Sequence, residues 1–144
     1  MTAAPNIPPF HLAIPVADIA AARHFYGDVL GFPRGRSDER WTDWNVEGHQ
    51  VVTHQVDGYS HAVAGTNAVD DHQVPVPHFG LVLPVDRFQE LAARLVAAGI
   101  DFVIAPYVRF EGEPGEQWTM FFLDPSGNAL EFKAFRDPSQ LFAV

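Results

Sequence analysis

The sequence predicts an α+β fold in which one βαβββ plan is used twice. Residues 10–18 (FHLAIPVAD) are repeated almost unchanged at 78–86 (HFGLVLPVD). Each copy is followed by apolar residues at spacings of three and four, as in an amphipathic helix. Each helix is followed by three short runs that have the composition of strands.

The first copy begins with a strand at 10–18, because its residues are branched, apolar and closed by proline and an acid. Asp18 is the expected N-cap of a helix that ends before Gly31. Strands are expected at 33–36, 41–46 and 50–56, with Glu47 and Gly48 in the last turn. The apolar face of the helix contains Ile19, Ala22, Phe25, Tyr26, Val29 and Leu30.

The second copy repeats this order with a strand at 78–86 and a helix from Asp86 to Gly99. Strands follow at 102–110, 117–123 and 129–135, with the turn sequence DPSG at 124–127. The apolar face of this helix contains Phe88, Leu91, Leu95 and Val96. We therefore expect a single domain over 1–144, with module one at about 8–57, a polar linker at about 58–76, module two at about 77–136 and a C-terminal tail at 137–144.

Composition limits the kinds of function that need to be considered. The 144 residues are 47% hydrophobic, enough to bury a core without covalent staples. The absence of cysteine excludes disulfides, thiolate ligands and cysteine nucleophiles. A net charge of −9 argues against nucleic acid as a partner. With no recognisable signal peptide and no long apolar run, the expectation is a soluble, cytoplasmic protein that acts without a membrane.

Three polar residues stand at unusual places in apolar strands. His11 and His78 occupy matching positions in the two copies, and Glu131 lies on the strand that closes the second copy. A single histidine at a strand start is more often a hydrogen-bonded structural residue, but the repeat favours a shared role. Two imidazoles and a carboxylate suit a divalent metal with open positions. The sequence thus predicts a metal site of His11, His78 and Glu131, with Fe(II) preferred and Mn(II), Ni(II) or Zn(II) as alternatives.

Three segments carry a family resemblance: HLAIPVAD at 11–18, FYGDVLGF at 25–32 and FLDPSGNALE at 122–131. They resemble the vicinal oxygen chelate superfamily, which includes glyoxalase I, bleomycin and fosfomycin resistance proteins, methylmalonyl-CoA epimerase and extradiol dioxygenases. The closer match, at 48–54, 76–80 and 106–110, is to small predicted proteins related to extradiol dioxygenases. The resemblance implies a cup-shaped mixed sheet with flanking helices, a metal at the same three residues, a small-molecule substrate and a homodimer.

Departures from the family pattern bear on the reaction. Glyoxalase-like members place a further glutamate where this chain has Val52, so the chain resembles the three-ligand oxygenase type. His54 shares a strand face with Val52 and is a candidate weak fourth ligand or proton-transfer base, or else a solvated histidine. Extradiol enzymes commonly have a tyrosine where this chain has Phe121, and Tyr107 is the candidate replacement.

Arg109 is a candidate for holding a substrate carboxylate or enolate, with a surface ion pair as the alternative. Trp118 and Phe121 are candidate pocket walls.

Three functions follow from these observations. The leading prediction is an iron(II) extradiol-type dioxygenase whose small substrate chelates the metal through vicinal oxygens. The alternative is a glyoxalase- or epimerase-like lyase or isomerase that uses a divalent metal as Lewis acid. The third is a non-catalytic protein that sequesters an antibiotic.

Overall fold

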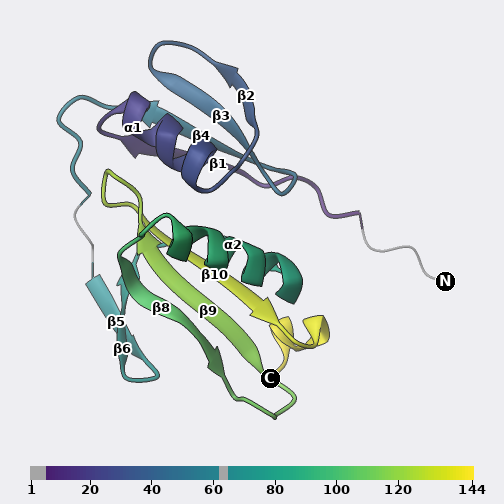
Figure 1. The fold of residues 1–144 in the computed structure, drawn as a ribbon. Helices are drawn as coiled ribbons and strands as arrows, with labels where there is room; N and C mark the ends of the chain where they lie inside the picture. Colours follow the sequence, from purple (N-terminus) through teal and green to yellow (C-terminus); the bar gives the residue numbers. More distant parts are fainter. Residues whose placement is uncertain (1–5, 62–64) are drawn as a thin grey trace. The chain divides into compact units, whose positions relative to one another are not determined.

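The structure is a computed structural model that describes residues 6–61 and 65–144. The chain divides into two compact units, Met1–Tyr59 and Ser60–Val144, each described here by itself (Figure 1). Each unit contains a four-stranded mixed sheet and one main helical segment. The predicted α+β class and the βαβββ order are therefore confirmed. No helix in the described part of the chain is long and apolar enough to cross a membrane.

The first unit has the strand order β1-β4-β3-β2, in which β1 runs parallel to β4 and the other neighbours are antiparallel. Its elements are β1 (His11–Val16), α1 (Ile19–Arg23), η1 (His24–Val29), β2 (Arg34–Ser37), β3 (Trp41–Val46) and β4 (His49–Gln55). These bounds lie within one or two residues of the predicted ones at most ends.

Asp18 caps the first helix as predicted, because its carboxylate accepts hydrogen bonds from the backbone N–H groups of Ala20 and Ala21 at 2.8 and 3.3 Å. The expected single α-helix is corrected in its second half, where α1 continues into η1, a segment of π-helix. Tyr26 in this segment is buried, and its ring lies 6.0 Å from that of Trp44 on β3. Gly31 ends the segment with a φ of 78°.

The second unit has the strand order β7-β10-β9-β8, with a separate hairpin of β5 and β6. Its elements are β5 (Gly65–Val69), β6 (His72–Val76), β7 (Val82–Leu83), α2 (Val85–Ala97), β8 (Phe102–Arg109), β9 (Gln117–Leu123), β10 (Ala129–Phe135) and the short 3-10 helix η2 (Pro138–Phe142). The tail predicted at 137–144 thus contains η2. In Figure 1, α2 lies along one face of the strands β9 and β10.

One prediction about α2 needs correction. Val96 was placed on the apolar face, yet it is 62% exposed, whereas Phe88, Leu91 and Leu95 are buried. One residue beyond Leu95 is about 100° further around the helix, so Val96 points away from the sheet. Asp86 lies in the first turn and Pro84 is the N-cap residue. In the first turn the negative charge of Asp86 interacts favourably with the helix dipole.

The polar linker predicted at 58–76 is also corrected, because it contains the β5–β6 hairpin. Asp70 and Asp71 form its turn with φ values of 47° and 64°, as the tight turns of hairpins require. Val74 anchors the hairpin by packing with Ile104 of β8 and Phe121 of β9. The hairpin therefore covers part of the sheet face that carries Phe121.

The strand predicted at 78–86 is regular only at β7, with an isolated bridge between Phe79 and Leu130. The backbone nevertheless follows β10, because Phe79 donates to Ala129 and accepts from Glu131. This run carries His78 to the neighbourhood of Glu131.

Candidate metal centre

Strand alternation gives β10 one apolar face and one polar face. Leu130, Phe132 and Ala134 are buried on the first face. Glu131 and Lys133 lie on the second, which also carries Thr119 and Phe121 of β9. We name this second side the pocket face. The Glu131 side chain is 13% exposed, so its charge must be met by local partners.

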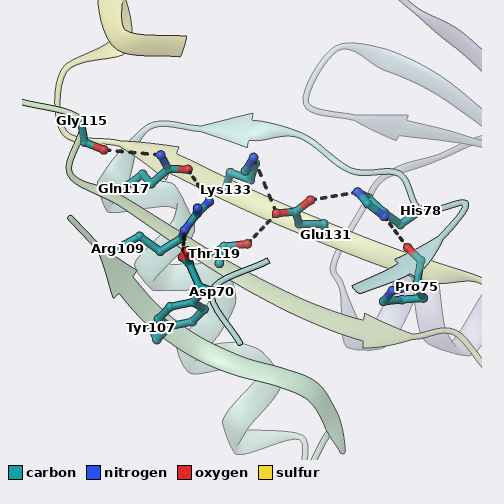
Figure 2. Close-up of polar contacts among 10 residues, drawn as sticks. All are labelled: Asp70, Pro75, His78, Tyr107, Arg109, Gly115, Gln117, Thr119, Glu131 and Lys133. Carbon is teal, nitrogen blue, oxygen red and sulfur yellow. Dashed lines mark hydrogen bonds and ion pairs between the residues drawn. The ribbon is translucent and has the colours of Figure 1, made fainter. Parts of the chain in front are cut away.

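Three side chains contact the Glu131 carboxylate (Figure 2). Thr119 donates its hydroxyl to Oε1 at 2.7 Å. Lys133 Nζ lies 3.8 Å from the same oxygen. His78 Nε2 lies 3.1 Å from Oε2. The carboxylate is therefore fixed on one side by a hydroxyl and turned toward an imidazole on the other.

The second nitrogen of His78 explains how the ring is oriented. Its Nδ1 lies 2.6 Å from the backbone oxygen of Pro75. A carbonyl oxygen can only accept, so Nδ1 carries the hydrogen. In the neutral ring the lone pair of Nε2 then faces Glu131, and two acceptors converge. The donor set fits a divalent cation, with Pro75 and Thr119 in the orienting roles that such sites use. The Phe121 ring packs edge-on against the imidazole, 4.9 Å between centroids.

Gly80 makes this approach possible. A Cβ added at Gly80 would lie 1.6 Å from the backbone oxygen of Glu131, a distance that no side chain can occupy. Glycine inside a strand-like run indicates close backbone contact. Here the contact lies between the segment that carries His78 and the strand that carries Glu131.

The pocket face opens into a pocket of about 190 Å³ within the second unit. Its walls come from the hairpin, the segment after it, β8, β9 and β10: Val69, Val74, His78, Ile104, Tyr107, Arg109, Thr119, Phe121, Glu131 and Lys133. The sequence-predicted residues His78, Tyr107, Arg109, Phe121 and Glu131 are thus brought together. Trp118 is not among these lining residues, because it alternates to the opposite face of β9 from Thr119.

Asp70, at the tip of the hairpin, joins Tyr107 and Arg109 at one end of the pocket. Its carboxylate pairs with Arg109 Nε and accepts a 3.4 Å hydrogen bond from the Tyr107 hydroxyl. The Arg109 hydrogen bond holds the pKa of Asp70 below its usual range. Burial raises the pKa of Tyr107, and the negative charge of Asp70 raises it further. Tyr107 is therefore a protonated hydrogen-bond donor at neutral pH.

His11 lies in the first unit, at the exposed start of β1. Its Nδ1 is 2.8 Å from Oε1 of Gln50, its register partner on β4. This bond leaves Nε2 available, as the Pro75 bond does for His78. On the same face of β4, Val52 is buried and His54 is exposed, with its ring 6.5 Å from Trp41.

Within either unit, the described residues include no group of three or more histidine, aspartate or glutamate side chains suited to a metal. The pair His78 and Glu131 belongs to the second unit, and His11 belongs to the first. The three-ligand site remains a prediction.

Comparison with known proteins finds a family whose model matches most of the chain. Residues 9–132 match the family model described as the Glyoxalase/Bleomycin resistance protein/Dioxygenase superfamily. A glyoxalase/bleomycin resistance protein/dioxygenase from Alicyclobacillus acidocaldarius is 32% identical, with a TM-score of 0.77 over 98% of this chain and 100% of that one. No curated protein gave a significant match.

Two more distant structures share the fold. The genomically encoded fosfomycin resistance protein of Listeria monocytogenes is 15% identical, with a TM-score of 0.67 over 94% of this chain and 98% of that one. Lactoylglutathione lyase from Agrobacterium tumefaciens is 18% identical, with a TM-score of 0.63 over 97% and 98%.

Proposed function

Because the chain belongs to the Glyoxalase/Bleomycin resistance protein/Dioxygenase superfamily, we propose that it is a metal-dependent enzyme for a small substrate that chelates the metal through vicinal oxygens. The observation that carries this proposal is the convergence of His78 Nε2 and Glu131 Oε2 in the pocket, each oriented by a second partner. His11, which holds the matching position in the first βαβββ module, is the proposed third ligand.

The proposed ligand number favours an iron(II) extradiol-type dioxygenase. The residue that corresponds to Glu131 in the first module is Val52, which is buried and cannot ligate. Three protein ligands leave positions for two substrate oxygens and for dioxygen. When bound, the metal would lower the pKa of a substrate hydroxyl and stabilise the resulting negative charge. Mn(II), Ni(II) and Zn(II) are the alternative ions.

The chain's own residues would bind and orient the substrate. Tyr107 donates a hydrogen bond from its protonated hydroxyl, and Arg109 holds a negative group. Phe121 and Val74 exclude water from one wall. His54 is the proposed proton-transfer group, because its imidazole is exposed on the β4 face that carries Val52.

Phe121 favours a second candidate function. Its buried ring packs on His78 where ring-cleaving relatives commonly carry a tyrosine. A glyoxalase- or epimerase-like lyase or isomerase would need the metal as a Lewis acid and would not need that hydroxyl. A sequestering role without metal is disfavoured, because a binder has no need of the oriented His78–Glu131 pair.

Oxygen uptake separates these functions. Protein reconstituted anaerobically with Fe(II) and then mixed with a panel of catechols in aerated buffer should consume oxygen in proportion to the catechol added. A protein that retains Fe(II) and consumes no oxygen with any catechol contradicts the dioxygenase and favours the lyase or isomerase. We also propose that the protein is a cytoplasmic homodimer. Size-exclusion chromatography with light scattering would test the oligomeric state.

A further inference from the structure

Two cationic side chains, Lys133 and Arg109, line the pocket. Lys133 lies near Glu131, whereas Arg109 contacts Asp70 and Gln117 and uses only part of its hydrogen-bonding capacity. Its Nε pairs with Asp70, and its Nη1 lies 3.5 Å from Oε1 of Gln117, a long hydrogen bond. Among residues 6–61 and 65–144, Nη2 has no acceptor. The Arg109 side chain is 17% exposed. This largely buried guanidinium therefore has N–H groups that its present partners do not use, and a carboxylate bound in place of Asp70 could engage them as well.

The present partner of Arg109 lies on an exposed hairpin turn that could move away from the pocket. Asp70 stands at the turn of the β5–β6 hairpin, and its side chain is 39% exposed. If the turn moved outward, water would solvate this carboxylate at little cost, whereas the largely buried Arg109 would lose its charged partner. Separating the pair therefore costs Asp70 little, whereas Arg109 then requires another anion.

We propose that the pocket selects substrates that carry a carboxylate beyond their chelating oxygens, and that this carboxylate displaces Asp70 from Arg109. The proposal rests on the proposed function, since it assumes that Glu131 and His78 hold the metal that the substrate oxygens chelate. The Asp70 carboxylate already shows that the anion geometry is accepted by Arg109 and the Tyr107 hydroxyl. A substrate carboxylate would meet the same two donors.

The dimensions of the pocket limit the size of such a substrate. Arg109 is on β8 opposite Gln117 of β9, and Glu131 is on β10 opposite Phe121 of β9. The two backbones are therefore about 10 Å apart across the sheet and about 13 Å apart along it, and both side chains reach into the same pocket. The pocket volume of about 190 Å³ is below the ~300–1,000 Å³ of pockets for drug-sized ligands. One ring with a short acidic arm suits this volume.

Binding to metal-free protein tests this proposal separately from the metal. The probes are phenylacetate and its neutral analogue phenylacetamide, which lack vicinal oxygens, titrated into the full chain after chelator treatment and followed by calorimetry. Phenylacetate should bind about tenfold more tightly than phenylacetamide, as expected for a hydrogen bond to a charged group. Arg109→Gln should remove this preference, and Arg109→Lys should keep part of it, because the charge remains and the fork is lost.

The displacement itself is tested at the hairpin turn. Asp70→Asn removes the competing charge, so phenylacetate should bind about two- to fivefold more tightly, the value of a partly exposed ion pair. Asp71→Asn is the matched control, since it changes the neighbouring turn residue, which makes no contact with Arg109, and should leave the affinity unchanged.

Equal binding of phenylacetate and phenylacetamide would overturn the choice of substrate class, and so would tighter binding of phenyl phosphate than of phenylacetate. An unchanged or weaker affinity in Asp70→Asn would overturn the displacement. If instead the wild-type protein fails to bind metal while these anion results hold, the proposed metalloenzyme fails and the anion site stands. The two failures are therefore distinguishable.

Discussion

Substituting Gly80 by alanine tests whether close backbone contact holds the two ligands of the second unit together. The added Cβ would lie 1.6 Å from the backbone oxygen of Glu131, whereas ordinary contact begins at 3.4 Å. The two backbones must therefore separate by close to 2 Å. A shift of that size breaks the local ladder, because hydrogen bonds weaken steeply beyond their normal length.

The ladder sets the expected cost. Three backbone hydrogen bonds join this segment to β10: Phe79 to Ala129 at 3.2 Å, Glu131 to Phe79 at 2.8 Å and Lys133 to Leu81 at 3.0 Å. At about 0.5–1.5 kcal/mol each, their loss lowers the free energy of unfolding by about 1.5–4.5 kcal/mol. The separation also moves His78 away from Glu131, so metal affinity should fall together with stability.

Urea unfolding and metal competition against a chelator measure the two effects on Gly80→Ala. Gly115→Ala is the matched control, since a Cβ there meets nothing within 4 Å and its φ is not left-handed. The control should keep wild-type stability and metal affinity. A Gly80→Ala protein that unfolds at the wild-type urea concentration and binds metal equally well would refute the close contact.

Three further predictions concern the pocket. Thr119→Val removes the hydroxyl that donates to Glu131, so metal affinity should fall about 10–100-fold. Thr119→Ser keeps the hydroxyl and should keep the wild-type affinity. Equal affinity in both variants would exclude an orienting role for Thr119. Asp70→Asn removes a negative charge beside Tyr107, so the phenol should titrate at lower pH than in the wild type, as followed by phenolate absorbance; an unchanged titration would show that Asp70 does not raise that pKa. The pKa of Asp70 is lower in the folded chain than its usual 3.8, so its pairing with Arg109 stabilises the fold above about pH 4 and loses this effect as the pH falls through the lowered value. Arg109→Gln should therefore reduce the loss of unfolding free energy at acid pH, as measured by urea unfolding at a series of pH values. An unaltered pH dependence would contradict the pairing.

Elements that the sequence predicted well have a local cause. β9 and β10 were located to the residue, because each is a run of apolar and branched side chains bounded by turn residues. The cap at Asp18 and the stop at Gly31 also depend on single residues. The β5–β6 hairpin was missed because Gly65–Val69 is polar and exposed. Its order comes from Val74 packing on Ile104, a contact that no local pattern reveals.

The candidate site likewise contains residues that the sequence indicated and partners that it did not. The internal repeat singled out His78, and Glu131 stood out as an acid on an apolar strand. The structure brings the two side chains together in one pocket, and their role as ligands stays a prediction. The partners that orient them could not be predicted, since Thr119 reaches Glu131 through the register of β9 on β10. Gly80 carried a usable signal, as a glycine within a strand-like run.

The partner of Arg109 was also beyond sequence reasoning. Glutamates such as Glu116 lie close to Arg109 in sequence and could have paired with it, yet Arg109 pairs with Asp70, which is 39 residues away. Glu116 pairs with Arg136 instead. Tertiary contacts of this kind depend on which strands become neighbours.

Metal content of single-ligand variants tests the central claim most directly. The full-length wild-type protein, His11→Ala, His78→Ala and Glu131→Ala would be loaded with Fe(II) anaerobically, desalted and analysed for bound metal, with His24→Ala as control because His24 is exposed on η1. We expect the control to match the wild type and each ligand variant to lose affinity by more than the ~10–100-fold that outer partners contribute. Wild-type metal content in Glu131→Ala or His78→Ala would contradict the proposed centre, and wild-type content in His11→Ala would remove its third ligand.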